Sequence, residues 1–244
     1  MRLVEIEDNT NLLEKYKDEV NFALDKYNQG IVIYRGSGTY SQDIIYKDPT
    51  TLSTDRKSAN AWNYYTLWLS NNPQWAAYPK RNRSLICSTS YDKAASYENP
   101  VVIVPLINCK IGVCPAGDIW DSFKLVGNLH MFMKYVWFLF WKHDKHRFDG
   151  FSYQEMMQKL HEMTPEKFGK FGFDKFDNLM VKFNNNAEAM LQNVFDPVDN
   201  NFTLTSWKQF NILGDREVWL SAPCLLIKPE IFNRLAEDRK NAIG

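Results

Sequence analysis

The first apolar pattern along the chain is that of an amphipathic helix. Asn9 or Thr10 can cap the start of this helix, and Gly30 can end it. From residue 12 onward, apolar side chains recur three or four positions apart, at Leu12, Leu13, Tyr16, Val20, Ala23, Leu24 and Tyr27. Because this period places them on one face of a helix, the sequence predicts an N-terminal amphipathic helix.

Short runs of apolar, often β-branched residues predict strands. These runs are residues 31–34, 85–87, 101–104, 217–220 and 224–227. Their length and the turn residues around them are typical of strands. The first run is closed by Arg35-Gly36-Ser37-Gly38, so we expect Arg35 at the end of a strand, facing a loop.

Helical periodicity returns in several places. It is present at residues 56–69 and 91–97 and from Pro229 onward, and residues 129–195 are mainly helical in pattern. The most apolar part, residues 129–141, is too short to span a bilayer. Its small polar face predicts a helix that is packed on several sides or covered by a partner. We expect one domain over residues 1–244, with a mainly helical insert at about 129–195.

Composition narrows the class of protein. The 29 Lys and Arg residues equal the 29 Asp and Glu residues, so no overall field draws the chain to nucleic acid or to an anionic membrane. The charged first eight residues argue against a secretory signal. His143, Asp144 and His146 lie in a charged segment without further ligands at metal spacing, so no metal site is expected. Reduced core thiols are predicted for Cys87, Cys109, Cys114 and Cys224, which lie within or beside apolar runs.

Three short motifs carry the candidate chemistry. They are Tyr34-Arg35-Gly36 after the first strand, Ser88-Thr89-Ser90 after the second, and Asp215-Arg216-Glu217-Val218 opening a later one. Taken singly, each has a structural explanation, as a strand-end arginine, a helix N-cap and a solvated pair of carboxylates. Their order along the chain is more informative than any one motif.

The set resembles the Arg, Ser-Thr-Ser, Glu-x-Glu class of ADP-ribosyltransferases. This class includes cholera-toxin-like and clostridial-toxin-like enzymes and phage-encoded mono-ADP-ribosyltransferases. The resemblance covers the three motifs and their strands, about half of the chain, and does not extend to the helical insert. It implies an α+β fold whose split core of two small sheets surrounds an NAD cleft.

The resemblance also implies how NAD is bound and cleaved. Glu217 would stabilise the positive charge that develops on the ribose as nicotinamide leaves. It would also hydrogen-bond the ribose 2′-hydroxyl. Arg35 supplies a forked cation suited to the NAD pyrophosphate, and the backbone at Gly36 would recognise the nicotinamide amide.

The remaining motif residues would shape the cleft and serve the acceptor. Ser88 would orient the ribose and Glu217, while Thr89 and Ser90 would brace the cleft. Residues two apart on a strand project to the same face, so Asp215 and Glu217 can both point into it. Asp215 would then orient or deprotonate the acceptor, as the first glutamate does in members that modify arginine. Asp is one methylene shorter than the usual Glu or Gln, a departure that concerns the acceptor more than NAD cleavage.

Several functions remain open on the sequence. The leading one is a mono-ADP-ribosyltransferase that modifies a macromolecule, with protein arginine as the first acceptor. RNA or DNA could be the acceptor instead, through the basic turn of Lys80, Arg81 and Arg83, although the neutral net charge argues against it. Water could be the acceptor, which would make the protein an NAD glycohydrolase. A non-catalytic binding module could dock a partner on residues 129–141, where an inhibitory protein could also bind. A stand-alone catalytic domain would suit a toxin-like or phage-encoded enzyme in the host cytoplasm.

Overall fold

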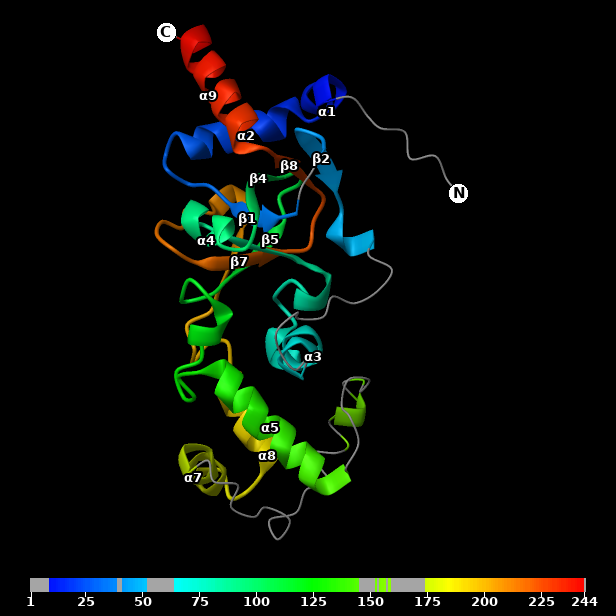
Figure 1. Cartoon of the computed structure of the whole chain (residues 1–244), viewed down its shortest axis with the longest axis vertical. Helices are drawn as coiled ribbons and strands as arrows, with labels where there is room; N and C mark the ends of the chain where they lie inside the picture. Colours follow the sequence, from blue (N-terminus) through cyan, green and yellow to red (C-terminus); the bar gives the residue numbers. More distant parts are fainter. Residues whose placement is uncertain are drawn as a thin grey trace. The chain divides into compact units, whose positions relative to one another are not determined.

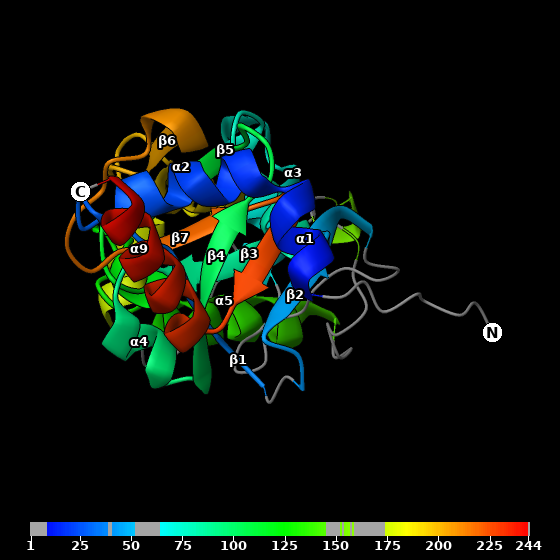
Figure 2. The ribbon, with the colours of Figure 1, turned by 90° about the horizontal axis from the view of Figure 1, so that it is seen from above.

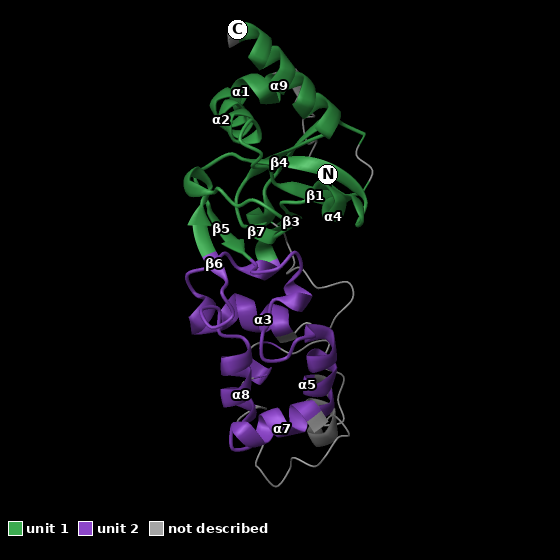
Figure 3. Cartoon of the chain, turned by 90° about the vertical axis from the view of Figure 1, so that its left-hand side faces the viewer, with its two compact units in different colours: residues 1–53, 83–113, 204–244 green, residues 54–82, 114–203 purple. Residues whose placement is uncertain are grey.

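The fold is mixed α+β, with α-helices and one eight-stranded antiparallel sheet, whose elements are labelled in Figure 1. The computed structural model describes residues 9–38, 41–51, 64–144, 152, 154–156, 158 and 174–243. The chain divides into two compact units (Figure 3). Unit 1 contains residues 1–53, 83–113 and 204–244, and unit 2 contains residues 54–82 and 114–203.

The sheet belongs to unit 1 apart from Thr203. Its strands are β1 (Tyr34–Ser37), β2 (Ile44–Lys47), β3 (Leu85–Ser88), β4 (Asn99–Pro105), β5 (Lys110–Val113), β6 (Thr203–Ser206), β7 (Glu217–Leu220) and β8 (Cys224–Ile227). Their order across the sheet is β2-β8-β4-β1-β3-β7-β5-β6. Strands distant in sequence are therefore neighbours, because β8 separates β2 from β4 and β7 separates β3 from β5.

The two central strands of the sheet, β1 and β3, pair through few residues. Strand β1 pairs with β4 along all four of its residues, whereas it pairs with β3 through Tyr34 and Ser88 alone. This junction divides the sheet into one half of β2-β8-β4-β1 and another of β3-β7-β5-β6. The two small sheets expected from the resemblance are thus joined here as halves of one sheet.

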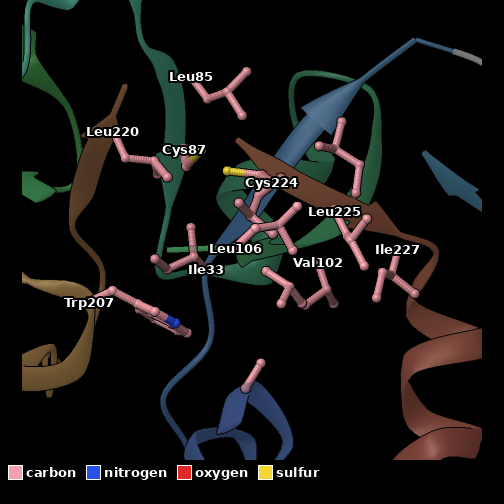
Figure 4. Packing of buried hydrophobic residues seen from close by; sticks show 14 of the residues in the cluster. Ile33, Leu85, Cys87, Val102, Leu106, Trp207, Leu220, Cys224, Leu225 and Ile227 are labelled. Carbon is pink, nitrogen blue, oxygen red and sulfur yellow. The ribbon is translucent and has the colours of Figure 1, made fainter. Parts of the chain in front are cut away.

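One hydrophobic core unites the two halves. It combines Leu85 and Leu220 of one half with Val102 and Leu225 of the other (Figure 4). Helices α2 (Lys17–Tyr27) and α9 (Pro229–Ile243) pack on β4, while α1 (Asn9–Lys15) packs on β2 (Figure 2). All four cysteines are buried thiols that form no disulfide with one another, which confirms the prediction of core thiols.

The predicted N-terminal helix is present, but it is broken at Tyr16 into α1 and α2. The second helix ends at Tyr27, and Gly30 follows with a φ of 76°. This left-handed conformation costs glycine little, so Gly30 allows the chain to turn toward the sheet.

The first strand lies further along the chain than predicted. It begins at Tyr34 instead of residue 31, so Arg35 lies inside the strand and not at its end. The reason is that Arg35, Gly36 and Ser37 pair with residues 99–101 of β4. Three strands, β2, β5 and β6, have no counterpart in the sequence prediction.

Unit 2 is helical in its described part. Its helices are α3 (Tyr64–Asn71), α5 (Leu129–Asp144), α7 (Asp174–Lys182) and α8 (Ala187–Val194). Phe123, Phe132 and Phe195 pack edge to face in its core, and Trp75 Nε1 donates a hydrogen bond to the carbonyl of Phe195 over 2.8 Å. The first part of the helix predicted at 56–69 lies outside the described residues. Within the described chain, no helix combines the length and apolar character needed to cross a membrane.

Candidate active site

The strands that carry the three motifs are neighbours in the sheet. Strand β3 lies between β1 and β7, and its last residue, Ser88, is the cross-strand partner of both Tyr34 and Glu217. Because adjacent strands are about 4.8 Å apart, the backbones of these residues lie side by side. Arg35 follows Tyr34 directly, so all three motifs meet at the junction between the two halves.

Ser88 and Glu217 form a buried pair on one face of the sheet. Cys87 precedes Ser88, and Val218 follows Glu217. These two residues are also cross-strand partners and belong to the hydrophobic core. Because side chains alternate along a strand, Ser88 and Glu217 point to the opposite face. Only 6% of Ser88 and 8% of Glu217 is exposed to solvent. A carboxylate shielded in this way interacts strongly with any positive charge that forms beside it.

Ser88 also contacts the first carboxylate of the third motif. Its Oγ donates a hydrogen bond of 3.4 Å to Asp215 Oδ1 and accepts one of 3.0 Å from the backbone N–H of Ser90. Asp215 precedes the start of β7 by two residues. Ser88 therefore contacts Asp215 through its hydroxyl and is also the cross-strand partner of Glu217.

Thr89 attaches the segment before β7 to the end of β3. Its N–H donates to the carbonyl of Arg216 over 3.0 Å, and its Oγ1 accepts from the N–H of Arg216 over 2.9 Å. The same hydroxyl donates to the carbonyl of Gly214. Ser90 begins the next element, since its Oγ accepts from the N–H of Lys93 and caps α4 (Tyr91–Ala95). Ser90 thus has the N-cap role that such a triplet predicts on structural grounds alone.

Arg35 lies at the junction, with its guanidinium directed at the backbone of β3. Nη1 donates a 2.5 Å hydrogen bond to the carbonyl of Ile86. Nε is buried and has no hydrogen-bond partner among the residues that the structure describes. Alternation along β1 sets the Arg35 side chain on the opposite face from Tyr34. The structure therefore brings the backbone of Arg35 beside Ser88, and its role toward NAD stays a prediction.

Gly36 allows a close approach, and the approaching group is α4. A methyl group at this position would overlap the carbonyl oxygen of Ala94 and lie 2.8 Å from Tyr97 Cβ. Real Cβ atoms do not come this close to their neighbours. Only a residue without a side chain lets α4 rest on β1.

An aromatic pair borders the junction. The rings of Tyr34 and Tyr91 meet edge to face, with centroids 5.5 Å apart and an interplanar angle of 90°. Tyr34 is half-buried, whereas Tyr91 is 47% exposed. Burial, with smaller effects of Tyr27 and Tyr91, raises the pKa of Tyr34. Tyr34 is held in place by its surroundings, while Tyr91 still presents part of its ring to solvent.

Sequence reasoning did not identify Lys26, which supports the segment leading to Asp215. Its Nζ donates hydrogen bonds to the carbonyls of Phe210, over 2.6 Å, and Lys208, over 3.3 Å. It also lies 5.2 Å and 5.7 Å from the ring centroids of Phe22 and Trp207. Burial lowers the pKa of this lysine. In the sequence, a lysine near the end of an amphipathic helix has no feature that distinguishes it from a solvated one.

Other candidate positions have more limited support. In the basic turn that could contact an RNA or DNA acceptor, Arg81 is buried, with 6% of the residue exposed. His146 lies outside the described residues, and the described part of the chain contains no group of three or more His, Cys, Asp or Glu residues able to hold a metal ion. A surface pocket of about 690 Å³ is lined by Gly38, Ala95, Glu98, Asn99 and Pro100.

Comparison of the chain with protein-family models, with curated proteins and with solved structures finds no match. Two carboxylates and a hydroxyl lie at one strand junction, beside the backbone of Arg35, and the carboxylates can stabilise a cationic reaction centre and accept a proton from a nucleophile.

Proposed function

We propose that this chain is a mono-ADP-ribosyltransferase that cleaves NAD and transfers ADP-ribose to protein arginine. The observation that carries the proposal is the adjacency of β1, β3 and β7, with Ser88 opposite both Tyr34 and Glu217. Three motifs separated by about fifty and then more than a hundred residues along the chain thereby meet at one place. A chance set of unrelated strand ends has no reason to do so.

The proposed reaction uses the buried pair on β3 and β7. The bond between C1′ of the ribose and the nicotinamide nitrogen breaks, and nicotinamide leaves with the bonding electrons. Glu217 stabilises the resulting positive charge on the ribose, in a site from which water is largely excluded. Ser88, held by its bonds to Ser90 and Asp215, orients the ribose.

The second half of the reaction uses Asp215. A guanidinium nitrogen of the acceptor forms the new bond to C1′, and its proton passes to the Asp215 carboxylate. The hydrogen bond from Ser88 holds Asp215 beside the serine that would orient the ribose, which supports this role. The narrow junction between β1 and β3 also supports the finer part of the proposal, a split core whose halves flank the NAD cleft.

The decisive experiment measures both products of the reaction. The protein is incubated with NAD labelled in its adenylate part, with a cell extract as the source of acceptors, and nicotinamide release and labelled protein are quantified. We expect Glu217→Gln to lower both by about 100-fold or more, because it removes the charge that stabilises the transition state. Glu237→Gln, an exposed change on α9, is the matched control and should behave as wild type.

Two results would overturn the proposal. One is an absence of nicotinamide release by the wild type, and the other is equal turnover by wild type and Glu217→Gln. The acceptor is tested separately, because ADP-ribose on arginine is released by neutral hydroxylamine. Label that resists this treatment would exclude arginine while leaving NAD cleavage intact.

A further inference from the structure

Tyr91 is an exposed aromatic residue at the proposed site. It is the first residue of α4, immediately after the capping residue Ser90. Tyrosine rings usually bury most of their surface, yet 47% of Tyr91 is exposed. The ring is not loose on the surface, because the edge-to-face contact with Tyr34 fixes its orientation.

Two hydrogen bonds connect Asp215 to Ser90, the residue before Tyr91. Asp215 Oδ1 accepts from Ser88 Oγ, which in turn accepts from the N–H of Ser90, the residue before Tyr91. Tyr34, which supports the Tyr91 ring, is the cross-strand partner of Ser88. Ser88 therefore contacts Asp215 through its side chain, and its cross-strand partner Tyr34 contacts the ring of Tyr91.

Two neighbouring cations contact other groups. Lys93, on the same helix, lies over the ring of Tyr97, with Nζ 5.7 Å from its centroid. Arg216 donates from Nη1 to the carbonyl of Asp215 over 2.9 Å. Neither of these two contacts uses the ring of Tyr91 or the carboxylate of Asp215.

We infer that Tyr91 and Asp215 together form the acceptor subsite, in which the guanidinium of the acceptor arginine stacks on the Tyr91 ring and pairs with the Asp215 carboxylate. A planar cation satisfies both groups, because its face meets the ring and its edge donates to the carboxylate. An ammonium group lacks this flat face, so the subsite favours arginine over lysine. The inference depends on the proposed function and adds the residue that selects its acceptor.

The experiment uses agmatine, a small guanidino compound, as the acceptor. Water competes with agmatine for the ribosyl cation, so the ratio of ADP-ribosyl-agmatine to free ADP-ribose reports how well the acceptor is held. At an agmatine concentration below saturation, we expect Tyr91→Ala to lower this ratio by about 3- to 10-fold. Tyr91→Phe keeps the aromatic face and should stay within about twofold of wild type.

Tyr97→Ala is the matched control, because Tyr97 is also an exposed tyrosine near α4, with 59% of the residue exposed. It should leave the ratio unchanged. An unchanged ratio in Tyr91→Ala, or an equal fall in Tyr97→Ala, overturns the subsite while leaving NAD cleavage intact. A wild-type protein that makes free ADP-ribose but no ADP-ribosyl-agmatine also overturns it. Absence of both products removes the proposed function itself.

Discussion

Replacing Gly36 by alanine tests the contact between α4 and β1. The added methyl group would overlap the carbonyl oxygen of Ala94 and would lie 2.8 Å from Tyr97 Cβ and 3.2 Å from the backbone nitrogen of Glu98. Two of these atoms are backbone, and the third is fixed to it. The clash therefore cannot be relieved by rotating a side chain, and α4 must move away from the strand.

The expected cost follows from similar overpacking changes, which destabilise proteins by about 1–3 kcal/mol. Taking about 2 kcal/mol, and about 2–4 °C per kcal/mol for a protein of this size, Gly36→Ala should lower the melting temperature by about 4–8 °C. Since Tyr91 begins α4, moving the helix should also reduce the proportion of agmatine product in the transfer assay.

Gly38→Ala is the matched control, two residues further along. Its methyl group would meet Glu98 Oε2 at 3.2 Å, the end of a flexible and exposed side chain. Because that carboxylate can rotate away, we expect a change in melting temperature of less than about 2 °C. Thermal unfolding followed by circular dichroism compares the two variants with wild type. If Gly36→Ala and Gly38→Ala melt together, α4 does not rest on β1 as described.

Three further predictions concern the core of unit 1 and the thiols. Lys26→Met removes the hydrogen-bond donors to the carbonyls of Phe210 and Lys208. It should lower the free energy of unfolding by about 2 kcal/mol, because a buried carbonyl loses its partner. An unchanged melting temperature would contradict the anchoring role of Lys26. The four buried cysteines should react with a thiol reagent only after denaturant is added, and rapid reaction of the native protein would show that the core is open. Burial raises the pKa of Cys109 from 9.0 to about 11, so the folded state keeps a proton that the unfolded state loses above pH 9. Stability should therefore fall as the pH rises from 9 to 11, by up to about 1.4 kcal/mol per pH unit from this group. Denaturant titrations of wild type and Cys109→Ser at several pH values measure the difference in slope, and equal slopes would refute this assignment.

Local patterns predicted the elements whose residues are consistently apolar. The helix after Asn9, the strands at 217–220 and 224–227 and the helix from Pro229 are all present. The prediction placed β1 three residues too early, because its ladder includes Gly36 and Ser37, which are usually turn residues. Their participation depends on pairing with β4, a contact that the local sequence does not encode.

The candidate site was predictable in its residue types and less so in its contacts. The order of the motifs identified Ser88, Asp215 and Glu217, and the register of β3 and β7 brings the first and last together. The hydrogen bond from Ser88 to Asp215 depends on how the chain enters β7. Lys26 was missed because its partners are backbone carbonyls, which carry no side-chain signature in any sequence.

The strand order has a consequence for how this protein is made. The last forty residues supply β7 and β8, and each of these strands lies between two strands encoded much earlier. A nascent chain that has not yet emerged beyond residue 204 therefore leaves facing edges of β2, β3, β4 and β5 without their central partners, and unpaired edges of this kind favour aggregation. The sheet can close only after β7 and β8 have been synthesised, at the same time as the carboxylate of Glu217 arrives, so a product truncated before residue 217 should lack the proposed site.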